Sequence, residues 1–205
     1  MATYSTTAIV NKALVLCGAT TVTAITDDTP NARAVNTIYE IARKTFLTEC
    51  RWSFSTTRST MATVATSTIA WFHTQEDETY VYTRPDALRV WEVSDIYAIW
   101  REEGDYLIAD TAGLGVKYAF DQSDLSKWRP SAIEAFIDKL CADISFMIIN
   151  DPKKAQIFLE KYEKISLPKA KSDNSQTGFQ QTVVDDAWTS AKYYNSGGDP
   201  SRSYG

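Results

Sequence analysis

The fold is decided between Leu14 and Arg58, a stretch that reads LVLCGATTVTAITDDTPNARAVNTIYEIARKTFLTECRWSFSTTR. Gly18 ends an apolar helical segment there, because glycine takes the left-handed conformation that follows many helices without strain. Thr29 and Pro30 begin a second helix, since threonine caps a helix and proline fits its first position. The stretch therefore predicts two helices followed by an aromatic, extended exit.

The two predicted helices differ in how they are buried. Ser5 and Thr6 can cap the first helix, whose apolar residues are too dense for one stripe and indicate burial on most sides. The second helix carries a single core-facing stripe at helical spacing. That stripe consists of Val35, Ile38, Tyr39, Ala42 and Phe46. After Arg51 the apolar period changes to two, at Trp52 and Phe54, which predicts a strand.

Residues 52 to about 120 have the pattern of β structure. Alternating runs separated by turn residues predict several short strands, a spacing typical of a small sandwich or open barrel. The runs are 56–70, 79–83, 88–93, 97–100, 106–109 and 116–120, with polar turns at 101–105 and 110–115. Pro85 ends one run, because proline cannot donate to a strand ladder.

Helical patterning returns at Trp128. Ser131 and Glu134 match a capping box, and apolar residues at spacings of three and four follow them. Pro152 stops this helix, because the residue before a proline avoids the helical region. A last helix is expected over residues 152–166.

The predicted fold class is α+β. A bundle of about four helices comes from residues 1–51 and 128–171, an antiparallel β sandwich or open barrel is inserted at 52–127, and an extended C-terminal arm covers 172–205. The arm holds four of the eight glycines and no continuous apolar stripe, so it cannot bury enough surface to order itself. Five aromatic residues beside element boundaries are expected in the core. They are Trp52, Phe54, Trp91, Trp100 and Trp128.

Composition and charge exclude several classes of protein. The chain has 205 residues, 44% of them hydrophobic, which is enough for a real core. Neither a membrane span nor a signal peptide is predicted, so we expect a soluble protein made in a cytoplasm. Between residues 73 and 110 ten acids face three arginines, a net of -7 within a total of -5. A protein that grips DNA phosphates is expected to show the opposite sign.

No metal or cofactor site is predicted from the cysteines and the histidine. Cys17, Cys50 and Cys141 are far apart in helical patterns and are expected to be buried thiols. A zinc site would lack ligands, because His73 is the single histidine. No Gly-x-Ser-x-Gly motif accompanies this histidine, so a catalytic triad is not expected.

No catalytic residues are predicted among the carboxylates either. Glu76, Asp77 and Glu78 could form a pair for glycoside hydrolysis with Asp95 or Asp110, but nothing fixes the separation that this chemistry needs. A solvated turn is the favoured interpretation of that acidic run. The glycine pair at 113 and 115 lacks the Gly-Lys-Ser/Thr ending of a phosphate loop, and a hairpin turn explains it.

In their order along the chain, these motifs resemble a known family. The glycine-stopped helix, the capped second helix, the Arg51 to Arg58 exit and the Pro85 to Val90 segment resemble the head-to-tail adaptor proteins of short-tailed bacteriophages, the family that includes tail tubular protein A. The resemblance covers about residues 5–171, and residues 185–191 also fit it. It implies a virion structural protein of the tail or neck, without enzymatic activity and without a cofactor.

The resemblance also implies partners. It implies a ring of twelve copies beneath the portal ring, joined to the tail nozzle and also open to contact with tail fibres, with DNA passing through its channel without sequence-specific binding. Contacts with the portal or a neighbouring subunit are expected in the aromatic arm, at Val183, Val184, Trp188, Tyr193 and Tyr194. An acidic surface facing the channel or the tail is expected at Glu76, Asp77, Glu78, Glu102 and Glu103.

Two other functions stay open at this point. One is a virion-associated hydrolase of peptidoglycan or oligosaccharide, which the carboxylates would serve. The other is a different connector ring of the same particle, such as a head-completion protein.

Overall fold

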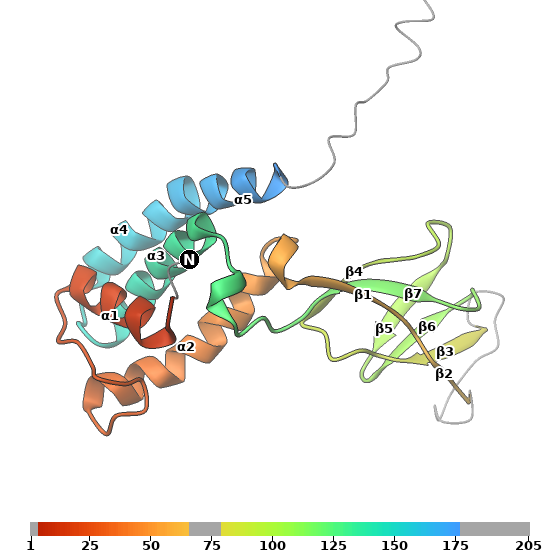
Figure 1. The fold of residues 1–205 in the computed structure, drawn as a ribbon, viewed down its shortest axis with the longest axis horizontal. Coiled ribbons are helices and arrows are strands. Elements are labelled where there is room, and N and C mark those ends of the chain that lie inside the picture. The colour runs from red at the N-terminus through yellow and green to blue at the C-terminus, as the bar shows by residue number, and fades with distance from the viewer. Residues whose placement is uncertain (1–3, 66–78, 177–205) are drawn as a thin grey trace, which may run out of the picture.

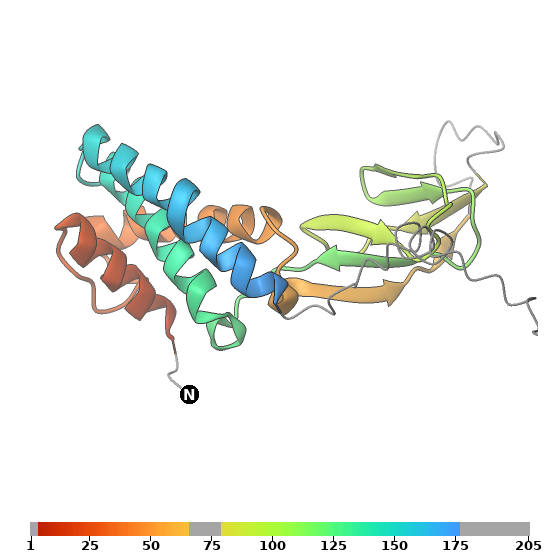
Figure 2. The same cartoon turned by 90° about the horizontal axis from the view of Figure 1, so that it is seen from above.

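A computed structural model describes residues 4–65 and 79–176; residues 1–3, 66–78 and 177–205 lie outside the described part of the chain. The fold is α+β, with the helices gathered at one end of an elongated molecule and the strands at the other (Figure 1). The helices are α1 (Thr6–Cys17), α2 (Pro30–Thr48), α3 (Pro130–Met147), α4 (Pro152–Lys161) and α5 (Leu167–Ser175). Figure 2 shows the same separation from above.

The predicted starts and the first helix end are confirmed at α1 and α2. The Ser5 hydroxyl accepts the N–H of Ala8 at 3.1 Å, and Gly18 follows α1 at φ 82°. The Thr29 hydroxyl accepts the N–H of Ala32 at 3.2 Å, and Pro30 is the first residue of α2. Local sequence signals therefore determine where these two helices begin.

An aromatic stack joins the helices to the strands. The ring of Phe46 lies 4.8 Å from that of Trp52 and 5.4 Å from that of Trp128, and Phe54 stacks on both tryptophans. Residues 53–55 form the short 3₁₀ helix η1 (Ser53–Ser55), so the strand expected from Trp52 begins only at Thr56. The period-two pattern of Trp52 and Phe54 did not indicate a strand here. Both rings pack in the aromatic stack, and neither faces a sheet.

The predicted capping box of α3 is wrong. Pro130 occupies the first helical position and Arg129 the N-cap, without a side-chain cap. Ser131 therefore lies inside the helix, where its hydroxyl donates to the Asp173 carboxylate of α5. The serine joins two helices instead of starting one.

The last helix continues past its predicted end at residue 166. After α4 the chain forms a π-helical turn, η4 (Tyr162–Ser166), and then α5, which ends at Ser175. The N–H of Leu167 reaches the carbonyl of Tyr162, and this wider turn accommodates Pro168, which has no N–H of its own. Helix therefore covers residues 172–175 of the predicted arm and Gln176 follows it, whereas residues 177–205 lie outside the described residues.

The strands form two antiparallel sheets, and among the described residues they do not close into a barrel. The strands are β1 (Thr56–Thr60), β2 (Thr63–Val64), β3 (Tyr80–Thr83), β4 (Arg89–Val93), β5 (Trp100–Glu103), β6 (Tyr106–Ala109) and β7 (Gly115–Ala119). One sheet has the order β1-β7-β4 and the other β2-β3-β6-β5. Residues of both sheets, among them Tyr82 and Val116, share one apolar cluster.

The boundaries around β5 differ from the prediction. The strand expected at 97–100 begins only at Trp100, and it continues through most of the expected turn to Glu103. Gly104, at φ 56°, makes the short connection to β6, because this conformation closes a tight hairpin without strain. Residues 94–99 therefore form a loop instead of a strand.

The helices share a core of their own, which includes the fully buried side chains of Leu14, Phe46 and Phe136. A short 3₁₀ helix, η3 (Leu125–Lys127), leads the chain back from the strands into this core. Within residues 4–65 and 79–176, we find no helix with the length and hydropathy needed to cross a membrane.

Candidate interaction surfaces

A groove of about 780 Å³ lies on the β part of the molecule. Strands β1, β4 and β7 contribute Arg58, Trp91 and Lys117 to its lining. The β4–β5 loop contributes Ile96 and Ala98, and β5 contributes Trp100. We refer to the strand residues Arg58, Trp91, Glu92 and Lys117 as the charged wall, and to Ile96, Ala98 and Trp100 as the apolar wall.

Glu92 is the electrostatic centre of the groove's charged wall. It accepts the Lys117 ammonium at 2.8 Å and the Arg51 guanidinium at 2.8 Å. The hydrogen bond from Lys117, supported by Arg51 and opposed by partial burial, lowers the pKa of Glu92 below its ordinary value. This carboxylate stays ionised at neutral pH, so it neutralises one of the cations around the groove.

Trp91 lies between two arginines at the edge of the groove. Its ring centroid is 5.6 Å from the Arg51 guanidinium carbon and 4.7 Å from that of Arg89, both within the range of cation–π attraction. A β-bulge lies at this position between Val90 and Glu92, and it leaves Trp91 unpaired in the ladder. The prediction that Trp91 and Trp100 belong to the core is only partly right, because both side chains are half-buried and line the groove.

Two buried polar atoms in the lining have no hydrogen-bond partner. They are Trp91 Nε1 and Ser59 Oγ, and only Tyr39 and Ser55 show the same feature in the rest of the described chain. Arg58 also lines the groove, and it forms no hydrogen bond or ion pair with the described residues. A guanidinium can only donate, and Glu92, the carboxylate of this wall, already accepts from Lys117 and Arg51.

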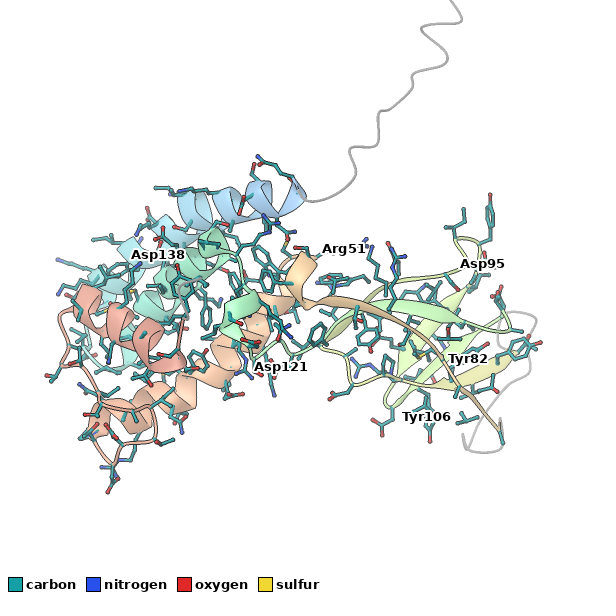
Figure 3. The ribbon with its side chains drawn as sticks, viewed as in Figure 1. Arg51, Tyr82, Asp95, Tyr106, Asp121 and Asp138 are labelled. Carbon is teal, nitrogen blue, oxygen red and sulfur yellow. The ribbon has the colours of Figure 1, made fainter. Side chains whose placement is uncertain are left out.

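The β4–β5 loop next to the groove exposes large apolar side chains. Ile96 is 84% exposed, Tyr97 85% and Ile99 56%. The Asp95 carboxylate accepts the N–H of Tyr97 at 2.9 Å, and this bond shapes the loop. Figure 3 shows Asp95 at the end of the molecule that lies away from the helices. We refer to Ile96, Tyr97 and Ile99 as the loop patch.

A second exposed apolar group lies at the opposite end, on the helices. The Ser145 hydroxyl donates to the Cys17 sulfur at 3.4 Å, so the C-terminal ends of α3 and α1 are adjacent. The neighbouring side chains are exposed: Leu16 by 48%, and Phe146 and Met147 by 64% each. We call these three residues the helix-end patch. Exposed apolar clusters of this kind often mark contact surfaces.

Two of the ten predicted site residues lie in the described part of the chain. Val183, Val184, Trp188, Tyr193 and Tyr194 lie outside the described residues, as do Glu76, Asp77 and Glu78. Glu102 and Glu103 lie on β5, where the first pairs with Arg84 at 3.1 Å and the second with Arg101 at 2.7 Å. Of the predicted acidic surface, the structure therefore describes only Glu102 and Glu103, and each is paired with an arginine.

The carboxylates considered for hydrolysis have structural roles where they are described. Asp110 accepts the N–H of Ile99 at 3.1 Å and the Thr111 hydroxyl at 2.8 Å, and Asp95 holds the same loop. In the helical part, the buried guanidinium of Arg43 pairs with Asp121 and Glu40. Burial alone would lower the pKa of Arg43, but these two carboxylates raise it, so this cluster is a stable ion network.

No group of three or more histidine, cysteine or acidic residues suited to a metal ion occurs among the residues that the structure describes. No protein-family model matches this chain, and no curated protein is significantly similar to it.

Sequence reasoning missed the groove and the loop patch. The signal that could have revealed the loop was the sequence of residues 94–98, in which Ser94 and Asp95 precede Ile96 and favour a turn. No sequence signal could reveal the groove, because its lining residues are far apart along the chain.

Proposed function

We propose that this protein is a head-to-tail adaptor of a short-tailed bacteriophage, a structural protein that joins the portal to the tail nozzle. One observation carries the proposal: exposed apolar patches lie at both ends of an elongated chain, the helix-end patch at one end and the loop patch at the other. A connector needs two separate contact surfaces, because it meets a different ring on each side. The ordered motifs that resemble the adaptor family support the same function.

In this proposal the helices form a bundle that builds the wall of a twelvefold ring and meets the portal. The strands form a β sandwich that projects toward the nozzle and tail fibres, and the arm from residue 177 reaches the portal or a neighbouring subunit. The protein is made in the host cytoplasm and is incorporated into the neck of the virion.

DNA passes through the channel of the proposed ring without being gripped. The segment between residues 73 and 110 carries a net charge of -7, and Glu102 and Glu103 of this segment are at least one-third exposed. Like charge repels phosphate, and a wall that forms no phosphate contacts has none to break as DNA moves. The function requires no cofactor and no catalytic residue.

Electron microscopy of the purified full chain mixed with the portal protein of the same genome tests the proposal. We expect rings with twelvefold symmetry in which added density caps the portal. The full chain mixed with an unrelated ring protein of similar size is the control. Portal rings that stay bare at micromolar concentrations of both proteins would contradict the proposal.

A further inference from the structure

The groove on β1, β4 and β7 is lined by an exposed arginine, Arg58. Arg58 presents donors there without a partner among the described residues. Its exposed guanidinium can only donate, so the charged wall is suited to an occupant that brings carboxylates or carbonyl groups. The apolar wall, with Ile96, favours apolar or aromatic side chains in the occupant.

The charges around the groove favour an acidic occupant. Arg51, Arg89, Arg58 and Lys117 lie in the lining or at its edge, against the acids Glu92 and Asp95. Glu92 is already shared between Lys117 and Arg51. The excess of cations therefore centres on Arg58, which has no hydrogen-bond or ion-pair partner among the described residues.

The chain itself contains a segment with the required chemistry. Residues 183–188 read VVDDAW, which combines two carboxylates with valine and tryptophan side chains. Two adjacent aspartates match the cationic wall, and the valines and the indole match the apolar wall. These residues lie outside the described part of the chain.

The end of α5 places this segment within reach. The Asn174 amide donates to the Arg51 carbonyl at 2.9 Å, and the Arg51 side chain in turn bonds Glu92 and lies over Trp91. Figure 3 shows Arg51 where the helices meet the strands. Six residues lie between Gln176 and Val183, and the seven Cα-to-Cα steps that join the two can span at most about 23–25 Å when extended. A tether of this length gives the segment a high effective concentration at the groove.

We propose that, before the protein binds any partner protein, the groove is the docking site for residues 183–188 of the same chain. Asp185 or Asp186 pairs with Arg58, and Trp188 packs on Ile96 and Trp100. The docked segment covers part of the loop patch. This docking is a property of the isolated chain and does not rest on the adaptor function.

Photocrosslinking of the full chain tests the proposal. With p-benzoylphenylalanine in place of Trp188, irradiation should join position 188 to residues 58–60, 91–100 or 115–117 in a product with the mass of one chain. The same probe in place of Tyr204 is the control, and its yield of groove crosslinks should be at least fivefold lower. Crosslinks that fall mainly outside the groove, or a product with the mass of two chains, would overturn the docking.

A charge exchange tests the ionic contact separately. Arg58→Glu should lower the yield of groove crosslinks at least threefold, and Asp185→Lys combined with Asp186→Lys in the same chain should restore it. Lys127→Glu makes the same charge change at an exposed site outside the groove and should leave the yield unchanged. Circular dichroism of each variant shows whether the fold is intact. A folded Arg58→Glu variant with the yield of the parent would overturn the proposed role of this arginine.

Discussion

The side-chain amide of Asn174 lies 2.9 Å from the carbonyl oxygen of Arg51, and it also accepts the N–H of Ser53 at 2.9 Å. One buried residue near the end of α5 thus satisfies two backbone groups in the segment that leads from α2 into β1. Backbone groups that leave the regular ladders need such partners, because an unpaired buried group costs free energy. This contact joins the last described turn of the chain to the point where the helices give way to strands.

Replacing Asn174 should destabilise the protein. Asn174→Ala leaves the Ser53 N–H and the Arg51 carbonyl without their partner, so the free energy of unfolding should fall by about 1–3 kcal/mol. Urea denaturation followed by circular dichroism measures the change. Ser175→Ala, one residue further on an exposed position, is the matched control and should change the stability by less than about 0.5 kcal/mol. Equal effects of the two substitutions would show that the Asn174 contact is not important for stability.

The ionised form of Asp143 should cost stability. Burial raises the pKa of Asp143 above its ordinary value, and Lys139 offsets this only in part. Because the folded state holds the proton more tightly than the unfolded state, the penalty is present above the folded pKa and disappears below the unfolded pKa. Asp143→Asn should therefore raise the melting temperature at pH 7, and the gain should vanish as the pH falls below about 4. A gain that is the same at pH 7 and pH 3.5 would exclude this origin.

The three thiols should differ in reactivity. Cys17 and Cys141 are buried between α1 and α3, whereas Cys50 is half-buried. Reaction requires access as well as a thiolate, and burial raises the pKa of Cys50. A thiol-specific chromophoric disulfide should modify one thiol of the native protein slowly at pH 8, and all three in denaturant. Cys50→Ser should abolish the native reaction, so rapid modification of two thiols in the native state would contradict the described packing.

The two exposed patches should be separable by mutation. Phe146→Asp changes the helix-end patch and Tyr97→Asp the loop patch, and both side chains are more than half exposed. The stability of each variant should stay within about 0.5 kcal/mol of the parent, because exposed positions contribute little to folding. Under the proposed function, each substitution should abolish binding to a different partner. Pull-down with the portal and with the nozzle protein measures this, and loss of both partners in either variant would contradict two separate surfaces.

The sequence alone determined the elements whose signals are local. Gly18, Thr29 and Pro30 fixed the adjoining ends of α1 and α2, because capping and the left-handed conformation depend only on neighbouring residues. Alternating runs likewise located most of the strands. The separation into terminal helices and central strands follows from these signals.

The tertiary structure alone decided the features that depend on contacts between residues far apart in the sequence. Ser131 was expected to cap α3, but its hydroxyl bonds Asp173 of α5. Trp52 was expected in a strand, but its ring stacks on that of Phe46. The groove exists only because β1, β4 and β7, separated in sequence, pair in one sheet. Local propensity cannot report such contacts, since their free energy comes from groups that meet only after the chain has folded.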